Sequence, residues 1–159
     1  MKRTKQTIIN RNLMAKTALF AGTFDPYTKG HHSIVQRALA VFDKVVVAVG
    51  NNAGKEKMLA PQERKAAIEK VYSGEPRVEV VVYDGLTMDY ARSIGAAAIV
   101  RGVRSVKDFE YERDLADINL RLGGIETVLF ISSPENASLS SSVVRELASY
   151  GKDVSSLLP

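Results

Sequence analysis

The residues between positions 22 and 31 combine several groups that can bind phosphate. They read GTFDPYTKGH, follow an apolar segment at 18–21 and precede an amphipathic one. This context predicts a strand, a tight loop and the start of a helix, where exposed N–H groups and the positive end of the helix dipole favour anions. Thr23 offers a hydroxyl, Gly30 lets the backbone approach a ligand, and we expect Asp25 to hold its own loop through backbone hydrogen bonds. The run is therefore interpreted as a phosphate-binding loop.

His31 falls in the first turn of the predicted helix. The helix dipole opposes a positive charge there, so we expect a neutral imidazole in the empty site and a charged one when a triphosphate binds. A single histidine in this position could instead cap the helix or lie on the surface, but the spacing of the whole run favours a role in the chemistry. His32 has no comparable context and is interpreted as a surface residue.

A second cationic group follows the apolar segment 96–100 and reads RGVR. Its two arginines, Arg101 and Arg104, would leave the end of a strand three positions apart, which suits bidentate binding of phosphate. The alternative is that both are surface charges paired with Asp108 or Glu110. The glycine between them and their place at a strand end favour the binding site.

Three other features are weaker when each is taken alone. The serine-rich segment 138–142 precedes a helix, where serines cap the helix or contribute to a second phosphate site at its N-terminus. Lys55 and Lys57 lie in a polar loop, either as solvated charges or as point charges delivered to a phosphate. On the helix after the arginines, Glu112 shares a face with Phe109 and could point into the site.

Strand-like and helix-like segments alternate along the chain, which predicts an α/β fold. We expect strands at 17–22, 44–50, 77–83, 97–101 and 127–132. We expect helices at 31–42, from 61 onward, and at 86–92, 105–122 and 141–150. This order predicts a single doubly wound, Rossmann-like domain with a five-stranded parallel sheet. Ligands of such sheets bind at the carboxyl ends of the strands, where the polar segments above would meet.

Composition limits the class of protein. The chain has 159 residues, of which 45% are hydrophobic and 25% charged, and it has no cysteine. These values suit one globular domain without disulfides or thiolate metal sites. No apolar run approaches the ~20 residues of a membrane span, and the N-terminus has no secretory signal, so we expect a cytoplasmic protein without a membrane partner.

The net charge of +4 comes from the first thirteen residues, which carry four basic side chains and no acid. Positions 14–159 are formally neutral, so the chain gives little support for a nucleic-acid partner. We interpret 1–13 as a disordered or extended leader, with a basic interaction arm as the alternative, and 14–159 as one folded domain. The chain has neither GxxxxGK[ST] nor GxGxxG, so by motif it is neither a P-loop kinase nor a dinucleotide dehydrogenase. It also has no metal-ligand pattern, and without a nucleophile elbow a Ser-His-Asp enzyme is excluded.

Together these segments resemble the nucleotidyltransferase superfamily, which is marked by threonine and Gly-His near the N-terminus and a serine-rich helix start near the C-terminus. Within it, the match is closer to the phosphopantetheine adenylyltransferase family. The matching segments are GTFDPYTKGH at 22–31, RGVRSVKDFEYE at 101–112 and SLSSSVVRE at 138–146. Residues 86–92 also resemble the family's short helix before the fourth strand, and the resemblance covers 17 to about 158.

The resemblance implies that ATP and 4′-phosphopantetheine give dephospho-coenzyme A and pyrophosphate, with Mg²⁺ carried by the ATP phosphates. It also implies a homohexamer and feedback inhibition by coenzyme A. By motif position, it implies catalytic roles for His31, Lys55 and Arg104, and substrate contacts for Thr23, Lys55, Thr87 and Arg101. The ATP site would be formed by Thr23, Phe24, His31, Gly102, Val103, Arg104, Glu112, Asn136, Ala137, Ser138, Leu139, Ser140, Ser141 and Ser142.

Two alternatives remain open at this point. The first is another transfer within the superfamily, to nicotinamide mononucleotide or glycerol phosphate, and the run at 101–112 speaks against both acceptors. The second is a non-catalytic nucleotide sensor that kept the fold. The presence of Thr23, His31, Lys55 and Arg104 disfavours the sensor.

Overall fold

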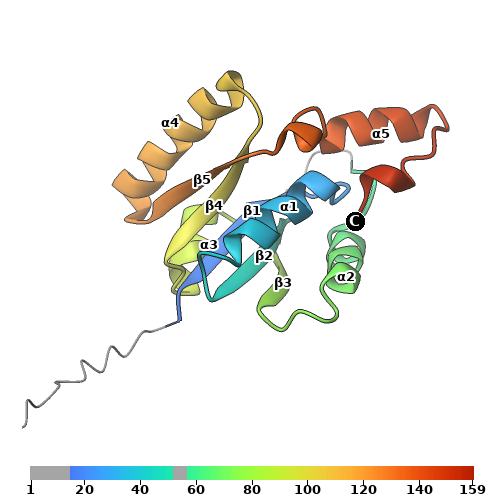
Figure 1. The fold of residues 1–159 in the computed structure, drawn as a ribbon. Helices are drawn as coiled ribbons and strands as arrows, with labels where there is room; N and C mark the ends of the chain where they lie inside the picture. Colours follow the sequence, from blue (N-terminus) through green and yellow to red (C-terminus); the bar gives the residue numbers. More distant parts are fainter. Residues whose placement is uncertain (1–14, 52–56) are drawn as a thin grey trace, which may run out of the picture.

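The computed structural model describes residues 15–51 and 57–159, in which five parallel strands form one sheet (Figure 1). The predicted leader and Lys55 lie outside these residues. The strands are β1 (Thr17–Gly22), β2 (Lys44–Gly50), β3 (Val78–Tyr83), β4 (Ala98–Val103) and β5 (Glu126–Ile131). Their order in the sheet is β3-β2-β1-β4-β5, and every neighbouring pair is parallel. The predicted α/β fold class is confirmed.

Five α-helices and two short 3₁₀ helices connect or follow the strands. The α-helices are α1 (Lys29–Ala38), α2 (Pro61–Val71), α3 (Thr87–Ser93), α4 (Val106–Gly123) and α5 (Ser141–Ser149). The 3₁₀ helices are η1 (Pro134–Asn136) and η2 (Ser155–Leu157). None of the helices within the described ranges is long and apolar enough to cross a membrane.

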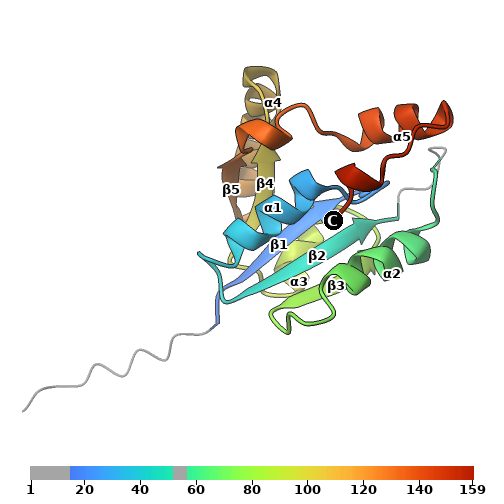
Figure 2. The ribbon, with the colours of Figure 1, turned by 45° about the vertical axis from the view of Figure 1, so that its right-hand side comes forward.

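The sheet is covered on both faces because its strands are apolar on both sides. On one face, Phe20 and Val47 pack with Ile34 of α1 and Ile68 of α2. On the other face, residues of opposite parity in β1 and β2 pack against α3 and the segment that follows α4. Figure 2 shows α1 and α2 in front of the sheet and α3 behind it. Since side chains alternate along a strand, this arrangement explains the nearly continuous apolar runs in the sequence.

Local capping decides where several helices begin and end. Thr28, Ser105 and Ser140 are N-caps whose side chains accept a backbone N–H of the first turn, at His31, Asp108 and Val143. For this reason the first helix begins at Lys29, two residues before the predicted start, and it ends at Ala38. Gly124 adopts a left-handed conformation with φ 63° and ends α4, as the glycine pair in the sequence predicts.

The order of the strands creates a crevice between β1 and β4. These two strands are neighbours, but the chain leaves β1 toward α1 on one face and leaves β4 toward α4 on the other. The connections therefore separate at the carboxyl ends of the two strands, which is where doubly wound sheets bind ligands. The N-terminus of α5 lies beside the β1–α1 loop, where Ser141 Oγ donates to the carbonyl of Pro26 over 2.8 Å (Figure 1).

Candidate functional site

A cavity of about 550 Å³ opens at this crevice. Its lining comes from four separate stretches of sequence: the β1–α1 loop, the β4–α4 connection with α4, the segment before and at the start of α5, and Lys57. Most of the expected site residues border it: Thr23, Phe24, His31, Arg101, Gly102, Arg104, Glu112, Asn136, Leu139, Ser140, Ser141 and Ser142. The fold thus brings together residues up to 120 positions apart, and their individual roles stay predictions.

Four expected site residues do not line this cavity. Thr87 begins α3 and its Oγ1 lies 2.8 Å from the hydroxyl of Tyr83. Val103 is buried in β4, Ser138 lines a smaller hollow beside α5, and Ala137 follows η1 outside the lining. Their assignments rest on the family resemblance alone. The assignment of Lys55 falls outside the described residues.

The imidazole of His31 is held in one orientation. Its Nδ1 accepts the backbone N–H of Thr28 over 3.0 Å, and the ring stacks on Tyr27 with 5.4 Å between centroids. The ring of Phe24 packs edge-on against it at 5.0 Å, from a backbone position with φ 52°, which is uncommon outside glycine. Because Nδ1 is an acceptor, the proton of the neutral ring sits on Nε2. His31 is therefore arranged to donate one hydrogen bond from Nε2.

Burial, together with the charges of Arg104 and then Arg101, lowers the pKa of His31 to about 4. The structure thus agrees with the expectation of a neutral imidazole, although burial rather than the helix dipole is the main cause. The expectation that a triphosphate makes the ring charged meets an obstacle. Protonation at Nδ1 would set its N–H against the N–H of Thr28. The geometry favours a neutral donor in the occupied site as well.

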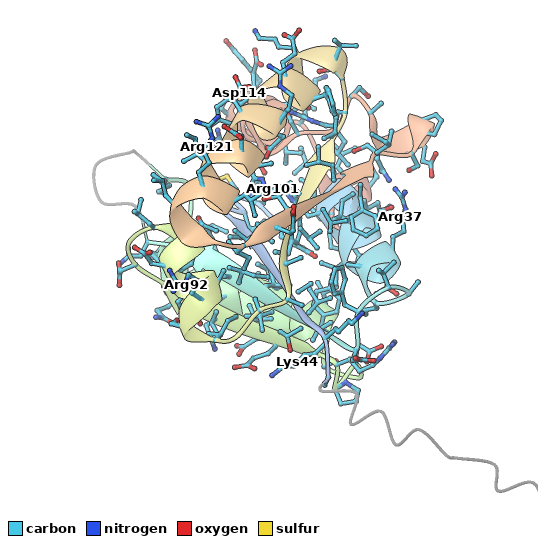
Figure 3. All side chains as sticks on the ribbon, turned by 90° about the vertical axis from the view of Figure 1, so that its left-hand side faces the viewer. Arg37, Lys44, Arg92, Arg101, Asp114 and Arg121 are labelled. Atoms are coloured by element: carbon cyan, nitrogen blue, oxygen red, sulfur yellow. The ribbon has the colours of Figure 1, made fainter. Side chains whose placement is uncertain are left out.

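Arg101 of β4 lies between the sheet and α4 (Figure 3), and it forms an ion pair with Glu112 of α4. Its Nε and Nη2 donate to the two carboxylate oxygens of Glu112 over 2.8 and 2.7 Å. Its Nη1 donates to the carbonyl of Ala21 over 2.9 Å. A guanidinium has five N–H groups, so these three bonds leave two for which the described residues supply no partner. The alternative interpretation, a surface pairing with Asp108 or Glu110, does not hold for Arg101, whose carboxylate partner is Glu112.

Arg104 fits both interpretations offered by the sequence, because it pairs with Asp108 and also borders the cavity as a candidate phosphate-binding residue. Its Nε donates to Asp108 over 3.1 Å, and a second nitrogen donates to the carbonyl of Leu139 over 3.3 Å. Both members of the ion pair are about one-third exposed and both line the cavity. Ion pairs of this exposure contribute about 1 kcal/mol or less, so an anionic ligand can replace the carboxylate at low cost.

The serines at the start of α5 have mixed roles. Ser140 is the N-cap, Ser141 binds the β1–α1 loop, and Ser142 Oγ accepts from Arg145 over 3.2 Å. The capping interpretation is therefore correct for Ser140. The same three serines also border the cavity, so the N-terminal turn of α5 faces whatever binds there.

Some residues of the site were not found from the sequence. Arg145 lines the cavity and donates to the carbonyl of Asp25 over 2.7 Å, but an arginine inside an amphipathic helix looks solvated in a sequence. Thr28 was also missed. The spacing Thr-x-x-His could have indicated that Thr28 is an N-cap whose side chain binds His31, the third residue of the helix. His32, expected on the surface, is half-buried with Nδ1 3.0 Å from the hydroxyl of Tyr72.

The carboxylates of the cavity do not form a metal site. Those in the described lining are Asp25, Asp108 and Glu112, and each accepts hydrogen bonds from N–H groups of the protein. In the described part of the chain, no group of three His, Cys, Asp or Glu side chains is placed to hold a metal ion.

Comparison with known proteins agrees with the geometry. Residues 19–147 match the cytidylyltransferase-like family. A bifunctional NMN adenylyltransferase/ADP ribose pyrophosphatase from Francisella tularensis, crystallised with AMP and a manganese ion, shares the fold with a TM-score of 0.69 at 16% identity, over 91% of this chain and 44% of that one. A putative nicotinate-nucleotide adenylyltransferase from Vibrio parahaemolyticus superposes with a TM-score of 0.63 at 20% identity, over 91% of this chain and 94% of that one.

The relatives found by sequence share far more residues with this chain than the solved structures do, and they identify its family. The phosphopantetheine adenylyltransferase of Phocaeicola vulgatus is 51% identical over 144 residues, which cover 91% of this chain and 95% of the relative. That of Leuconostoc citreum is 52% identical over 136 residues, or 86% of each chain. The resemblance inferred from the motifs is confirmed over nearly the whole domain. The chain belongs to the phosphopantetheine adenylyltransferase family.

Proposed function

We propose that this chain transfers the adenylyl group of ATP to 4′-phosphopantetheine, giving dephospho-coenzyme A and pyrophosphate. The observation that carries the proposal is the convergence of His31, Arg101 and Arg104 on one cavity at the β1–β4 crevice. Relatives named for this activity share about half of the residues along nearly all of the chain. A cavity with several cationic side chains suits two reactants that are both anionic.

The reaction needs placement more than proton transfer. A phosphate oxygen of 4′-phosphopantetheine attacks the α-phosphorus of ATP, a new P–O bond forms, and the bond to the bridging oxygen breaks as pyrophosphate leaves. The attacking oxygen is already anionic, so no general base is required. Catalysis then depends on holding two anions in line and on stabilising the charge that develops on the α-phosphoryl group and the leaving group.

Each wall of the cavity supplies one part of this task. His31 Nε2 donates to the α-phosphoryl oxygens from a fixed, neutral ring, which gains a stronger hydrogen bond as negative charge develops there. The two remaining N–H groups of Arg101 hold the phosphate of phosphopantetheine. Arg104 and the N-terminal turn of α5 bind the leaving pyrophosphate. Lys57 borders the same space, and Lys55 keeps its proposed role beside the nucleophile.

An acceptor panel tests this proposal. The purified chain is given ATP with 4′-phosphopantetheine, nicotinamide mononucleotide or glycerol 3-phosphate, and pyrophosphate release is measured over many turnovers. We expect release with 4′-phosphopantetheine only. Faster release with either other acceptor would assign the chain to a different transfer, and binding of ATP without turnover on any acceptor would favour a nucleotide sensor.

We further propose that the ATP phosphates carry Mg²⁺ into the site. Support comes from the three lining carboxylates, which are already hydrogen-bonded to N–H groups and are poorly suited to bind a metal directly. Bound to the triphosphate, the ion would neutralise part of its charge. Release of pyrophosphate should therefore require a divalent ion that also binds ATP in the absence of the protein.

The remaining family expectations are proposals of the same kind. We propose a homohexamer, and support comes from α4, where Leu115, Ile118 and Leu122 form an exposed apolar stripe outside the cavity lining. Light scattering of the purified chain would give its mass. Feedback inhibition by coenzyme A and a cytoplasmic location follow from the resemblance. Since 14–159 is formally neutral, we propose no nucleic-acid partner.

A further inference from the structure

Arg64 of α2 carries a charge inside the protein, with only 1% of its surface exposed. In the described residues its partners are backbone carbonyls rather than carboxylates. Nε donates to the carbonyl of Leu59 over 3.1 Å, and Nη1 donates to Thr23 and, over 3.3 Å, to Gly50. The guanidinium thus joins three segments that lie far apart in sequence.

The place of these carbonyls in the sheet explains why an arginine is useful there. The ladder between β1 and β2 ends at the pair Gly22 and Val49, and the next residues of the two strands are Thr23 and Gly50. Beyond this point the ladder between the two strands ends, so the carbonyls of Thr23 and Gly50 need another hydrogen-bond donor. One nitrogen of Arg64 donates to both. Arg64 therefore continues the β1–β2 connection beyond the last strand pair, at the edge of the cavity.

Asp25 holds the same region from the opposite side. The expectation that it ties its own loop is wrong, because its carboxylate accepts the N–H groups of Met58 and Leu59 over 2.8 and 3.0 Å. Leu59 is thus held twice, by its N–H to Asp25 and by its carbonyl to Arg64. Lys57 precedes this anchored pair directly and lines the cavity. Its backbone position is set by the two buried charged residues.

A purely structural role would not favour a buried arginine. Burial lowers the pKa of Arg64, and the charge of Asp25 offsets part of that effect. Well-packed apolar residues usually stabilise a protein interior as well as buried charges do, or better. The arrangement therefore calls for a reason beyond stability, and two of the three segments that Arg64 joins border the proposed active site, one through Thr23 and the other through Lys57.

We propose that Arg64 and Asp25 form a buried clamp that positions Lys57 relative to Thr23 on the cavity wall, so that Arg64 is a positioning residue for the reaction. This proposal rests on the proposed function. Arg64 touches no reactant and acts through the backbone of Thr23 and of the segment at 57–59. Displacements of about 1 Å at such positions can lower turnover by orders of magnitude.

A double-mutant cycle tests the clamp. Arg64→Met keeps the length and the apolar stem but removes the three hydrogen bonds, and Lys57→Ala removes the side chain that the clamp is proposed to place. We expect Arg64→Met to lower kcat about tenfold in the wild-type background and less than about threefold in the Lys57→Ala background. An equal effect in both backgrounds would overturn the proposal. So would unchanged kcat and KM together with a lower melting temperature, because that is the behaviour of a structural residue.

Matched variants keep the result interpretable. Lys65→Met makes the same chemical change at the next, solvent-facing position of α2 and should leave kcat within about twofold of the wild-type value. If Arg64→Met does not fold, Asp25→Asn weakens the other half of the clamp and enters the same cycle. Calorimetric titration with ATP repeats the cycle without turnover, where equal loss of affinity in both backgrounds again overturns the clamp. The wild-type acceptor panel decides the proposed function separately.

Discussion

The two walls of the cavity place their functional groups in opposite ways. On the β1–α1 wall, His31 is fixed by a backbone N–H and packed between Tyr27 and Phe24, and its ring is neutral. On the β4–α4 wall, Arg101 and Arg104 carry full charge, are partly exposed and are each bound to a carboxylate. The donor on the first wall is rigidly held and uncharged, whereas the arginines on the second wall are charged and paired with carboxylates.

This difference separates binding from chemistry. A donor whose strength must match a developing charge is best held without reorganisation, which is what the packed histidine provides. Groups that bind incoming anions must first be kept stable without them, and the carboxylates of Glu112 and Asp108 serve that purpose. Changes at His31 should therefore mainly lower kcat, whereas changes at Arg101 should mainly raise KM.

Replacement of His31 by alanine is the strongest way to test the first wall. We expect kcat to fall by about 10²–10³, because one preorganised donor to the transition state is lost, with a smaller change in the KM for ATP. Steady-state pyrophosphate release measures both constants. A turnover within threefold of the wild-type value would show that the ring does not take part in the chemistry.

Replacement of Arg101 by alanine tests the second wall. We expect the KM for 4′-phosphopantetheine to rise by about 10–100-fold, since a charged hydrogen bond is worth about 1.5–3 kcal/mol, while kcat changes less. Arg113→Ala is the control, because that arginine is exposed on α4 and pairs only with its neighbour Asp114. An unchanged KM in the Arg101 variant would contradict the assignment and with it the contrast between the walls.

The sequence predicted the second wall less completely than the first. The run at 22–31 predicted strand, loop and helix together with His31 in the first turn, because all of these depend on local spacing. The partner of Arg101 depends on which face of α4 meets β4, and eleven positions separate it from Glu112. The sequence indicated that Glu112 could point into the site. The carboxylates weighed as alternative partners of the arginines were Asp108 and Glu110, of which only Asp108 pairs with one of them, Arg104.

Long-range polar contacts explain most of the remaining differences. The carboxylate of Asp25 binds a segment 33 and 34 positions away, and Arg145 reaches back 120 positions to the carbonyl of Asp25. Such contacts leave no periodic signal in one sequence, because each residue type is also common on surfaces. The structure also leaves the apolar side chains of Ile118 and Leu122 on α4 exposed, which the expected range of this helix did not indicate.

Thr28 offers a finer test of the rigid wall. Thr28→Val keeps the shape and the backbone N–H but removes the hydroxyl, which accepts the N–H of His31 and lies 3.1 Å from Nδ1. We expect stability to fall by about 1 kcal/mol through loss of the cap, and kcat to fall about threefold as the first turn loosens. Thr28→Ser should restore both values. If the serine variant behaves like the valine variant, the hydroxyl is not what holds the ring.

The pH dependence of turnover separates a fixed neutral donor from an ordinary histidine. With its pKa at about 4, His31 is neutral throughout pH 6–8, so kcat at saturating substrates should stay constant within about twofold across that range. A histidine of ordinary pKa, about 6.5, would become mostly charged by pH 6 and change kcat about fourfold. The phosphate of 4′-phosphopantetheine has its own second pKa of about 6, so the same profile is measured for His31→Asn. An inflection near pH 6.5 that the wild type shows and His31→Asn lacks would mean that substrates overcome the Thr28 contact and charge the ring.

The same depressed pKa has a consequence for stability with a definite sign. The unfolded chain takes up a proton on this histidine near pH 6.5, whereas the folded chain does so only near pH 4. Lowering the pH through this window therefore favours the unfolded state, by about 2 kcal/mol at pH 5 from this group alone. Urea denaturation at pH 7.5 and pH 5 should show a loss that is about 2 kcal/mol smaller in His31→Asn than in the wild type, since burial also lowers the pKa of His32, which adds to the loss in both proteins. Equal losses in both proteins would mean that another group causes it, and that the wall around His31 does not exclude its charge.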